Sequence, residues 1–65
     1  MSMFIKDTEY LTTQEAAKYI GSSGVTFKRL AEKYEIENHE FDGLGRKVFW
    51  KKTDLDRLLE KLGRR

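Results

Sequence analysis

The helical pattern of this sequence stops after two turns and resumes only a few residues later. Apolar residues recur at helical spacing within 16–20 and again within 27–34, and Gly21-Ser22-Ser23-Gly24 lies between them. Because glycine has no Cβ and adopts positive φ at little cost, Gly21 is suited to end the first helix. Ser23 is suited to cap the second. The sequence therefore predicts two short helices that meet at a tight turn.

The residues on either side of this break are typical of a helix-turn-helix. Thr12 is expected to cap the first helix, because Glu15 stands three residues later and each side chain can bind the other's backbone N–H. The second helix is expected over about 24–34, with one apolar face that consists of Phe27, Leu30, Ala31 and Tyr34. In such a motif the first helix supports the second, whose outer face can lie in a DNA major groove.

The rest of the chain predicts a β-hairpin and a third helix. Two short extended runs, 36–41 and 46–51, flank the turn Asp42-Gly43-Leu44-Gly45. Thr53, followed by acidic residues, repeats the capping pattern and predicts a leucine-rich helix over about 54–62.

Length and composition limit the class of protein. The chain has 65 residues, a net charge of +2 and no cysteine, which predicts one small domain, 1–65, without disulfides or thiolate metal sites. The sequence has neither a signal peptide nor an apolar run long enough to cross a membrane, so we expect a cytoplasmic protein that does not bind membranes. We expect no enzymatic activity, because no serine or carboxylate has the surroundings of a catalytic group.

Two stretches, LTTQEAAKYIGSSGVTFKRL and GRKVFWKKTDLDRLLEKL, resemble the winged helix-turn-helix domains of the excisionase and MerR superfamily, and the resemblance covers residues 10–62. It implies a mainly α fold with a small β-hairpin: a recognition helix at about 24–34, a two-stranded wing at about 36–51 and a C-terminal helix at about 54–62. In that family the second helix enters the major groove, and the wing touches the neighbouring minor groove or the DNA backbone.

The predicted DNA-binding residues are Ser23, Val25, Thr26, Lys28, Arg29, Lys33, Arg46 and Lys47. Ser23, Thr26, Arg29 and the pair Arg46-Lys47 match the motif of the resembled family. By their chemistry, the cations can neutralise phosphates, arginine can pair with guanine, the hydroxyls can donate to phosphate, and valine can meet a thymine methyl group. If about six cations contact phosphates, the logarithm of affinity falls with the logarithm of salt concentration at a slope of about −5. The alternative for these cations is a solvated helix face and a charged hairpin tip.

Other residues have simpler interpretations. Trp50, Phe41 and Val48 are expected in the core, and His39 alone falls short of a metal site, so we expect no metal and no cofactor. Alternation along the strand turns Phe49 away from Trp50, which leaves two possibilities: an exposed contact for a protein partner, or burial against the N-terminal Phe4 and Ile5.

Three functions remain open. The first is an excisionase-like architectural protein that binds repeated sites on double-stranded DNA, associates with its own neighbouring copies and assists an integrase. The second is a small transcriptional regulator of a prophage, plasmid or mobile element. The third is a protein-interaction module in which Phe49 and an acidic strand form the contact. The shortness of the chain favours the first, since MerR-type regulators append further domains.

Overall fold

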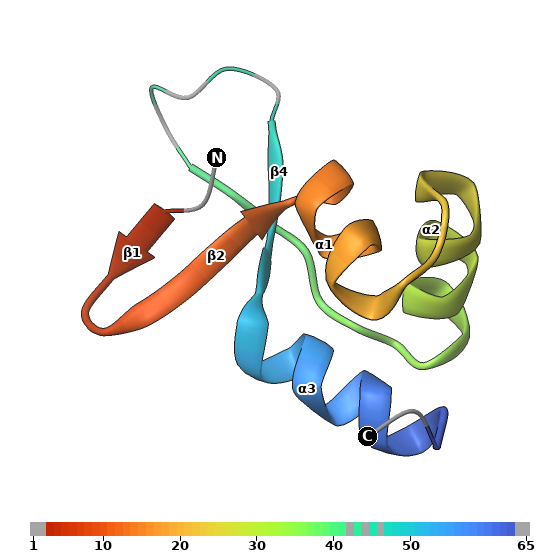
Figure 1. Ribbon diagram of the computed structural model, residues 1–65. Helices are drawn as coiled ribbons and strands as arrows, with labels where there is room; N and C mark the ends of the chain where they lie inside the picture. Colours follow the sequence, from red (N-terminus) through yellow and green to blue (C-terminus); the bar gives the residue numbers. More distant parts are fainter. Residues whose placement is uncertain (1–2, 42, 44, 46, 64–65) are drawn as a thin grey trace.

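The described residues form three helices and a curled antiparallel sheet in the computed structural model (Figure 1). The structure describes residues 3–41, 43, 45 and 47–63. The elements follow in the order β1 (Met3–Ile5), β2 (Thr8–Thr12), α1 (Thr13–Ile20), α2 (Gly24–Lys33), β3 (His39–Glu40), β4 (Val48–Lys51) and α3 (Lys52–Lys61).

The two helices of the helix-turn-helix form as the sequence predicts. Thr12 and Glu15 make the capping box that starts α1: the Thr12 N–H donates to Glu15 Oε1 at 2.9 Å, and the Glu15 N–H donates to Thr12 Oγ1 at 3.2 Å. Gly21 ends α1 at φ 75°. Its N–H and that of Ser22 bind carbonyls of the last turn of α1, which is a Schellman motif. The chain is thereby redirected into α2 within a few residues.

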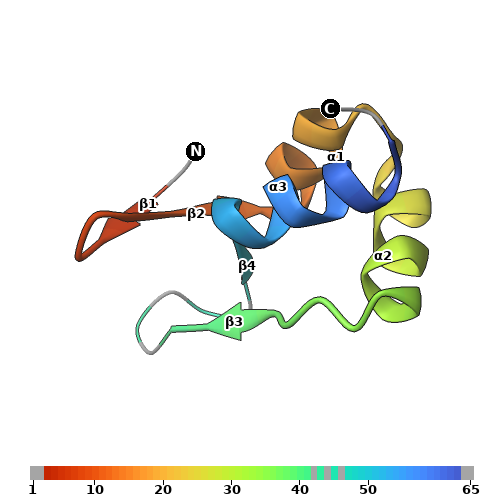
Figure 2. The same cartoon turned by 90° about the horizontal axis from the view of Figure 1, so that it is seen from below.

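The sheet is larger than predicted. Its strand order is β1-β2-β4-β3, all antiparallel, so the predicted hairpin is extended by two N-terminal strands. The tight turn between β1 and β2 consists of Lys6 and Asp7, at φ 48° and 66°. Such a turn is usually marked by asparagine or glycine, so no hairpin was predicted there. The β1–β2 hairpin projects away from the three helices (Figures 1 and 2).

The strand predicted over 36–41 is mostly wrong, because only His39 and Glu40 pair with β4. Ile36 instead packs against the helical core, which draws this segment of the chain out of the sheet. The predicted turn at 42–45 lies partly outside the described residues; Gly43 and Gly45 both have positive φ, as a turn requires.

The start of α3 also differs from the prediction. The helix begins at Lys52, and its N-cap is Lys51, which makes no side-chain cap hydrogen bond. The capping box predicted at Thr53 is therefore wrong: β4 runs directly into α3, so Thr53 already lies within the helix. The Lys52 ammonium reaches back to Glu9 of β2 at 3.4 Å.

The core lies between the helices and one face of the sheet. The Phe27 ring of α2 meets the Trp50 indole of β4 edge to face, with centroids 4.8 Å apart, and Leu55 and Leu58 of α3 are fully buried beside this core. The prediction that Trp50 is a core residue is confirmed. This packing fixes the position of α2 relative to β4, and hence the geometry of the surface between them.

Of the two possibilities for Phe49, the exposed contact is wrong. Phe49 does turn away from Trp50, but only 5% of it is exposed, because the second face of the sheet carries its own aromatic cluster. The Phe41 ring lies 5.6 Å from that of Phe49, and Tyr10 meets Phe41 at 5.1 Å. Phe4, in contrast, is 67% exposed.

Candidate nucleic-acid interface

The outward face of α2 carries the predicted major-groove residues. Phe27 and Ala31 are buried against the core, so the opposite side of the helix faces solvent. Val25 is 67% exposed there, and Lys28 and Arg29 are exposed beside it. This face offers the apolar side chain of Val25, the cations of Lys28 and Arg29 and the carboxylate of Glu32, on a helix whose other side is buried.

The hydroxyl groups of Ser23 and Thr26, at the start of α2, have different hydrogen-bonding roles. Ser23 Oγ accepts the Thr26 N–H at 3.2 Å and donates to Thr26 Oγ1 at 3.0 Å, so the Ser23 hydroxyl is occupied in capping the helix. The Thr26 hydroxyl accepts this bond and keeps its own hydrogen for an outside acceptor. Thr26 is thus the better donor to a phosphate at this helix end.

Lys33 lies at the other end of α2. It is exposed, and its ammonium lies 5.5 Å from the centroid of the Tyr34 ring, an attraction between cation and π system. Lys61 of α3 lies over the same ring at 5.6 Å. The Lys33 ammonium therefore contacts the Tyr34 ring at the end of α2.

The predicted wing is only partly described. Lys47 is exposed and directly precedes β4, whereas Arg46 lies outside the described residues. The described part of the connection between β3 and β4 lies on the side of the sheet away from α3 (Figure 1).

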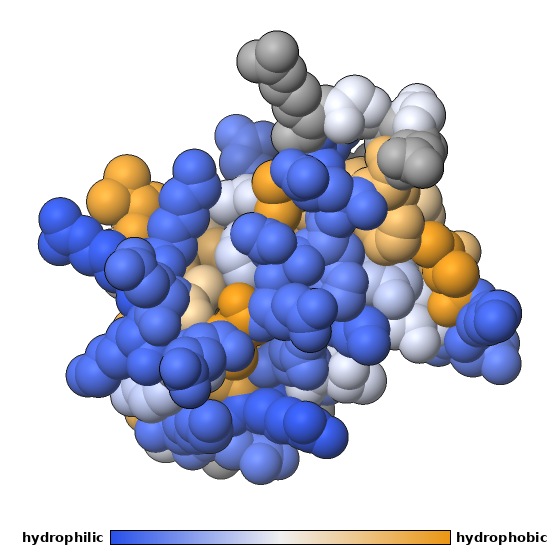
Figure 3. All heavy atoms as spheres, turned by 180° about the vertical axis from the view of Figure 1, so that it is seen from behind, coloured by the Kyte–Doolittle hydropathy of each residue, from blue (hydrophilic) through white to orange (hydrophobic). Residues whose placement is uncertain are grey.

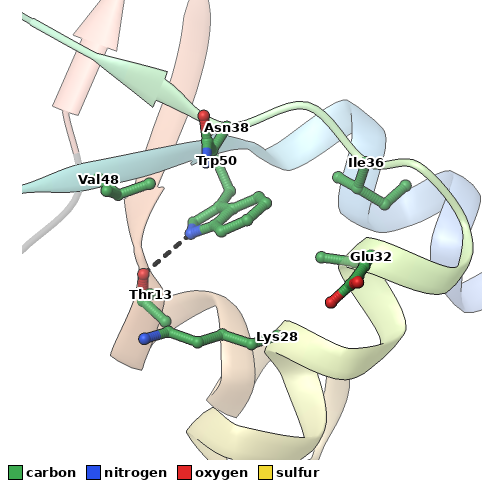
Figure 4. A pocket seen from close by; sticks show the side chains of 8 residues that line it. Thr13, Lys28, Glu32, Ile36, Asn38, Val48 and Trp50 are labelled. Carbon is green, nitrogen blue, oxygen red and sulfur yellow. Dashed lines mark hydrogen bonds between the residues drawn. The ribbon is translucent and has the colours of Figure 1, made fainter.

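A hollow lies between α2 and β4, beside the segment that leads into β3. Its volume is about 380 Å³, and it is lined by Thr13, Lys28, Ala31, Glu32, Ile36, Asn38, Val48 and Trp50 (Figure 4). Within it the Trp50 indole N–H donates to Thr13 Oγ1 at 3.0 Å. Sequence reasoning missed Thr13 and Asn38, because neither residue stands in a pattern that links it to Lys28.

Apolar residues gather on a different part of the surface. Seen from behind, the molecule is largely hydrophilic, and apolar atoms lie both on the side of the β1–β2 hairpin and on the side of α2 (Figure 3). Phe4 and Ile5 of β1 are exposed. This apolar edge is separate from the cationic face of α2.

Neither a metal centre nor a membrane span is evident in the described part of the chain. No group of three or more His, Asp or Glu residues there could hold a metal ion. Nε2 of His39 is buried and has no hydrogen-bond partner among the described residues. The centroid of the His39 ring lies 5.4 Å from that of Tyr10 and 6.4 Å from that of Phe41. None of the described helices has the length and apolar character needed to cross a membrane.

Comparison with known protein families shows which family the chain belongs to. A family model described as a helix-turn-helix domain matches residues 10–63. The chain belongs to this helix-turn-helix domain family. The match begins within β2 and leaves out β1, so the apolar edge at Phe4 lies outside the family's common part. No curated protein and no solved structure matched the chain.

Membership of the helix-turn-helix domain family identifies a small protein that binds double-stranded DNA. Domains of this family are not typically enzymes. The solvent-facing side of α2 carries Val25, Lys28 and Arg29 together with the exposed carboxylate of Glu32.

Proposed function

We propose that this helix-turn-helix protein is a sequence-specific architectural factor of the excisionase type. In this proposal α2 lies in the major groove, and the β3–β4 connection acts as a wing on the minor groove or backbone. Several copies bind adjacent repeats and help an integrase to assemble for excision. The exposed cationic face of α2, in a chain of this family, is the observation that carries the proposal.

Each residue of this face has a contact that suits its chemistry. Arg29 can pair with a guanine edge, Val25 with a thymine methyl group, and Thr26 with a phosphate. Lys28, Lys33, Lys47 and Arg46 neutralise phosphates, while Ser23 shapes the start of the helix. A net charge of +2 and one recognition helix per copy give weak binding alone, which favours cooperative binding at neighbouring sites.

The protein-interaction alternative loses its main support because Phe49 is buried. A transcriptional regulator would use the same α2 surface, so only its DNA target differs from that of an excisionase.

Footprinting on DNA that flanks the protein's own gene tests the proposal. Cooperative protection of phased repeats beside an attachment site is the expected result. Protection of a promoter alone would replace the excisionase with a regulator, and no binding at low salt would reject DNA binding altogether.

Arg29→Ala tests the role of α2 in the same assay. We expect a loss of about 1–3 kcal/mol in specific binding, together with relaxed preference at one base pair. Arg57→Ala is the matched control, because Arg57 is an exposed arginine on α3. Equal effects of the two substitutions would remove Arg29 from the interface.

A further inference from the structure

The hollow beside α2 adjoins another hollow. A second hollow, also about 380 Å³, is lined by Thr12, Thr13, Gln14, Lys47 and Val48. Thr13 and Val48 line both hollows, so the two hollows adjoin at these residues, and Lys28 of α2 lines the first whereas Lys47 lines the second. We call the two adjoining hollows the Thr13 trough.

The hydroxyl at the centre of the trough has a fixed direction. An indole N–H can only donate, so Thr13 Oγ1 must be the acceptor in its 3.0 Å hydrogen bond with Trp50 Nε1. The hydroxyl hydrogen of Thr13 is then left to point elsewhere, and none of the described residues accepts it. Trp50 is buried in the core and therefore holds Thr13 as a hydrogen-bond donor.

The charges along the trough favour an anion at Thr13. Lys28 and Lys47 are exposed, and neither forms an ion pair within the described residues. Lys28 extends from α2 toward Thr13 (Figure 4). Glu32 lines the first hollow together with Thr13 and Lys28, so its carboxylate opposes an anion there, whereas Lys47 lines the second hollow without an acidic neighbour in the lining.

We infer that the Thr13 trough seats one phosphate of the DNA backbone, which accepts a hydrogen bond from the Thr13 hydroxyl and lies between the ammonium groups of Lys28 and Lys47. This inference rests on the proposed function, since the phosphate belongs to the duplex whose major groove α2 enters. Val48 and Trp50 supply an apolar wall suited to the adjoining deoxyribose. The contact is independent of sequence and fixes how deeply α2 enters the groove.

Trp50 is a positioning residue in this arrangement. It does not itself touch the phosphate, but its N–H orients the hydroxyl that does. One hydrogen bond, from the Trp50 N–H to the Thr13 hydroxyl, therefore links the core of the protein to the inferred phosphate contact.

Thr13→Val tests the inference, with Thr13→Ser to retain the hydroxyl and Thr53→Val as a matched control on α3. Affinity is measured for a duplex selected from a random library and for a short duplex of mixed sequence, after circular dichroism shows each variant to be folded. We expect Thr13→Val to weaken binding of both duplexes about tenfold and by the same factor, because it removes one hydrogen bond to a charged group. Thr13→Ser and Thr53→Val should bind like the unchanged protein.

The outcomes separate the inference from the proposed function. If Thr13→Val binds DNA as tightly as the unchanged protein, the inferred phosphate contact in the Thr13 trough is wrong. The proposal that the protein binds DNA would still stand. A loss confined to the selected duplex would also overturn it, since it would indicate base readout. If the unchanged protein binds neither duplex, both proposals fail.

Glu32→Gln provides a second measurement that does not depend on the fold of Thr13→Val. Removing this exposed carboxylate from the trough should tighten binding of both duplexes about threefold, through reduced repulsion of the phosphate. Unchanged affinity for both duplexes would contradict the placement of a phosphate in the trough.

Discussion

At the scale of single residues, the backbone conformation between α1 and α2 decides whether glycine is needed at Gly21 or at Gly24. Gly21 has φ 75°, whereas Gly24 lies in the first turn of α2, and a Cβ added to either residue would meet no atom within 4 Å. Any cost of adding a Cβ at Gly21 therefore comes from the backbone conformation rather than from a clash.

Gly21→Ala should lower the free energy of unfolding by about 1–2 kcal/mol, the cost of holding alanine at positive φ. Gly24→Ala should leave it unchanged or raise it by up to about 1 kcal/mol, because alanine favours the helix. Urea denaturation measures both variants. An equal effect at the two glycines would show that the left-handed turn is not the constraint.

The carboxylate of Glu15 makes the first capping box sensitive to pH. Partial burial tends to raise the pKa of Glu15, but hydrogen bonds, including those from the Thr12 N–H and hydroxyl, outweigh it and hold this pKa below the ordinary value of 4.5. A pKa that is lower in the folded state contributes stability above pH 4.5, and this contribution is lost as the pH falls through the folded value.

Glu15→Gln should therefore weaken the dependence of stability on pH. Glutamine can keep the capping hydrogen bond but does not titrate. Thermal unfolding followed from about pH 6 to about pH 3 should show a smaller fall in Tm for the variant than for the unchanged protein. Identical pH profiles would mean that Glu15 contributes nothing to this dependence.

At the scale of elements, the sheet has two buried faces of different kinds. Trp50 of β4 faces the helices, whereas its neighbour Phe49 packs in an aromatic cluster with Phe41. The N-terminal strands enlarge the sheet beside this cluster, so β4 is central rather than the edge of a two-stranded wing.

Phe49→Ser should therefore unfold much of the protein. Loss of a buried phenylalanine costs about 3–5 kcal/mol, a large part of the stability of a small domain. Phe4→Ser is the control, and we expect it to change the free energy of unfolding by less than about 0.5 kcal/mol because Phe4 is exposed. Chemical denaturation compares the two, and a stable Phe49→Ser protein would contradict the burial of Phe49.

At the scale of the whole molecule, the arrangement of charge matters more than the net charge. The cations proposed to meet DNA lie on α2 and before β4, whereas the β1–β2 hairpin projects away from the helices (Figure 2). Binding should thus depend on salt far more steeply than a net charge of +2 suggests.

The salt dependence of DNA binding tests this distribution. With phosphate contacts from Lys28, Lys33, Arg46 and Lys47, the slope of log affinity against log salt concentration should be about −4, and Lys47→Gln should reduce its magnitude by about 1. Lys6→Gln, in the β1–β2 turn, should leave the slope unchanged. If both variants gave the same slope, Lys47 would have no place in the interface.

The sequence determined the local features whose causes lie within a few residues. The capping box of Thr12 and Glu15, the left-handed turn at Gly21 and the apolar face of α2 all follow from short-range hydrogen bonds, φ preferences and helical spacing. The helix-turn-helix and the exposed positions of Lys28 and Arg29 on it were therefore predictable.

Tertiary structure decided what depends on contacts between distant residues. The pairing of β2 with β4 places Thr13 beside Trp50, 37 residues away, and so creates the Thr13 trough. The same pairing buries Phe49 and carries β4 straight into α3, where the local pattern at Thr53 predicted a cap. Local patterns cannot specify which strands meet or what covers each face of a sheet, because burial depends on the whole set of packed elements.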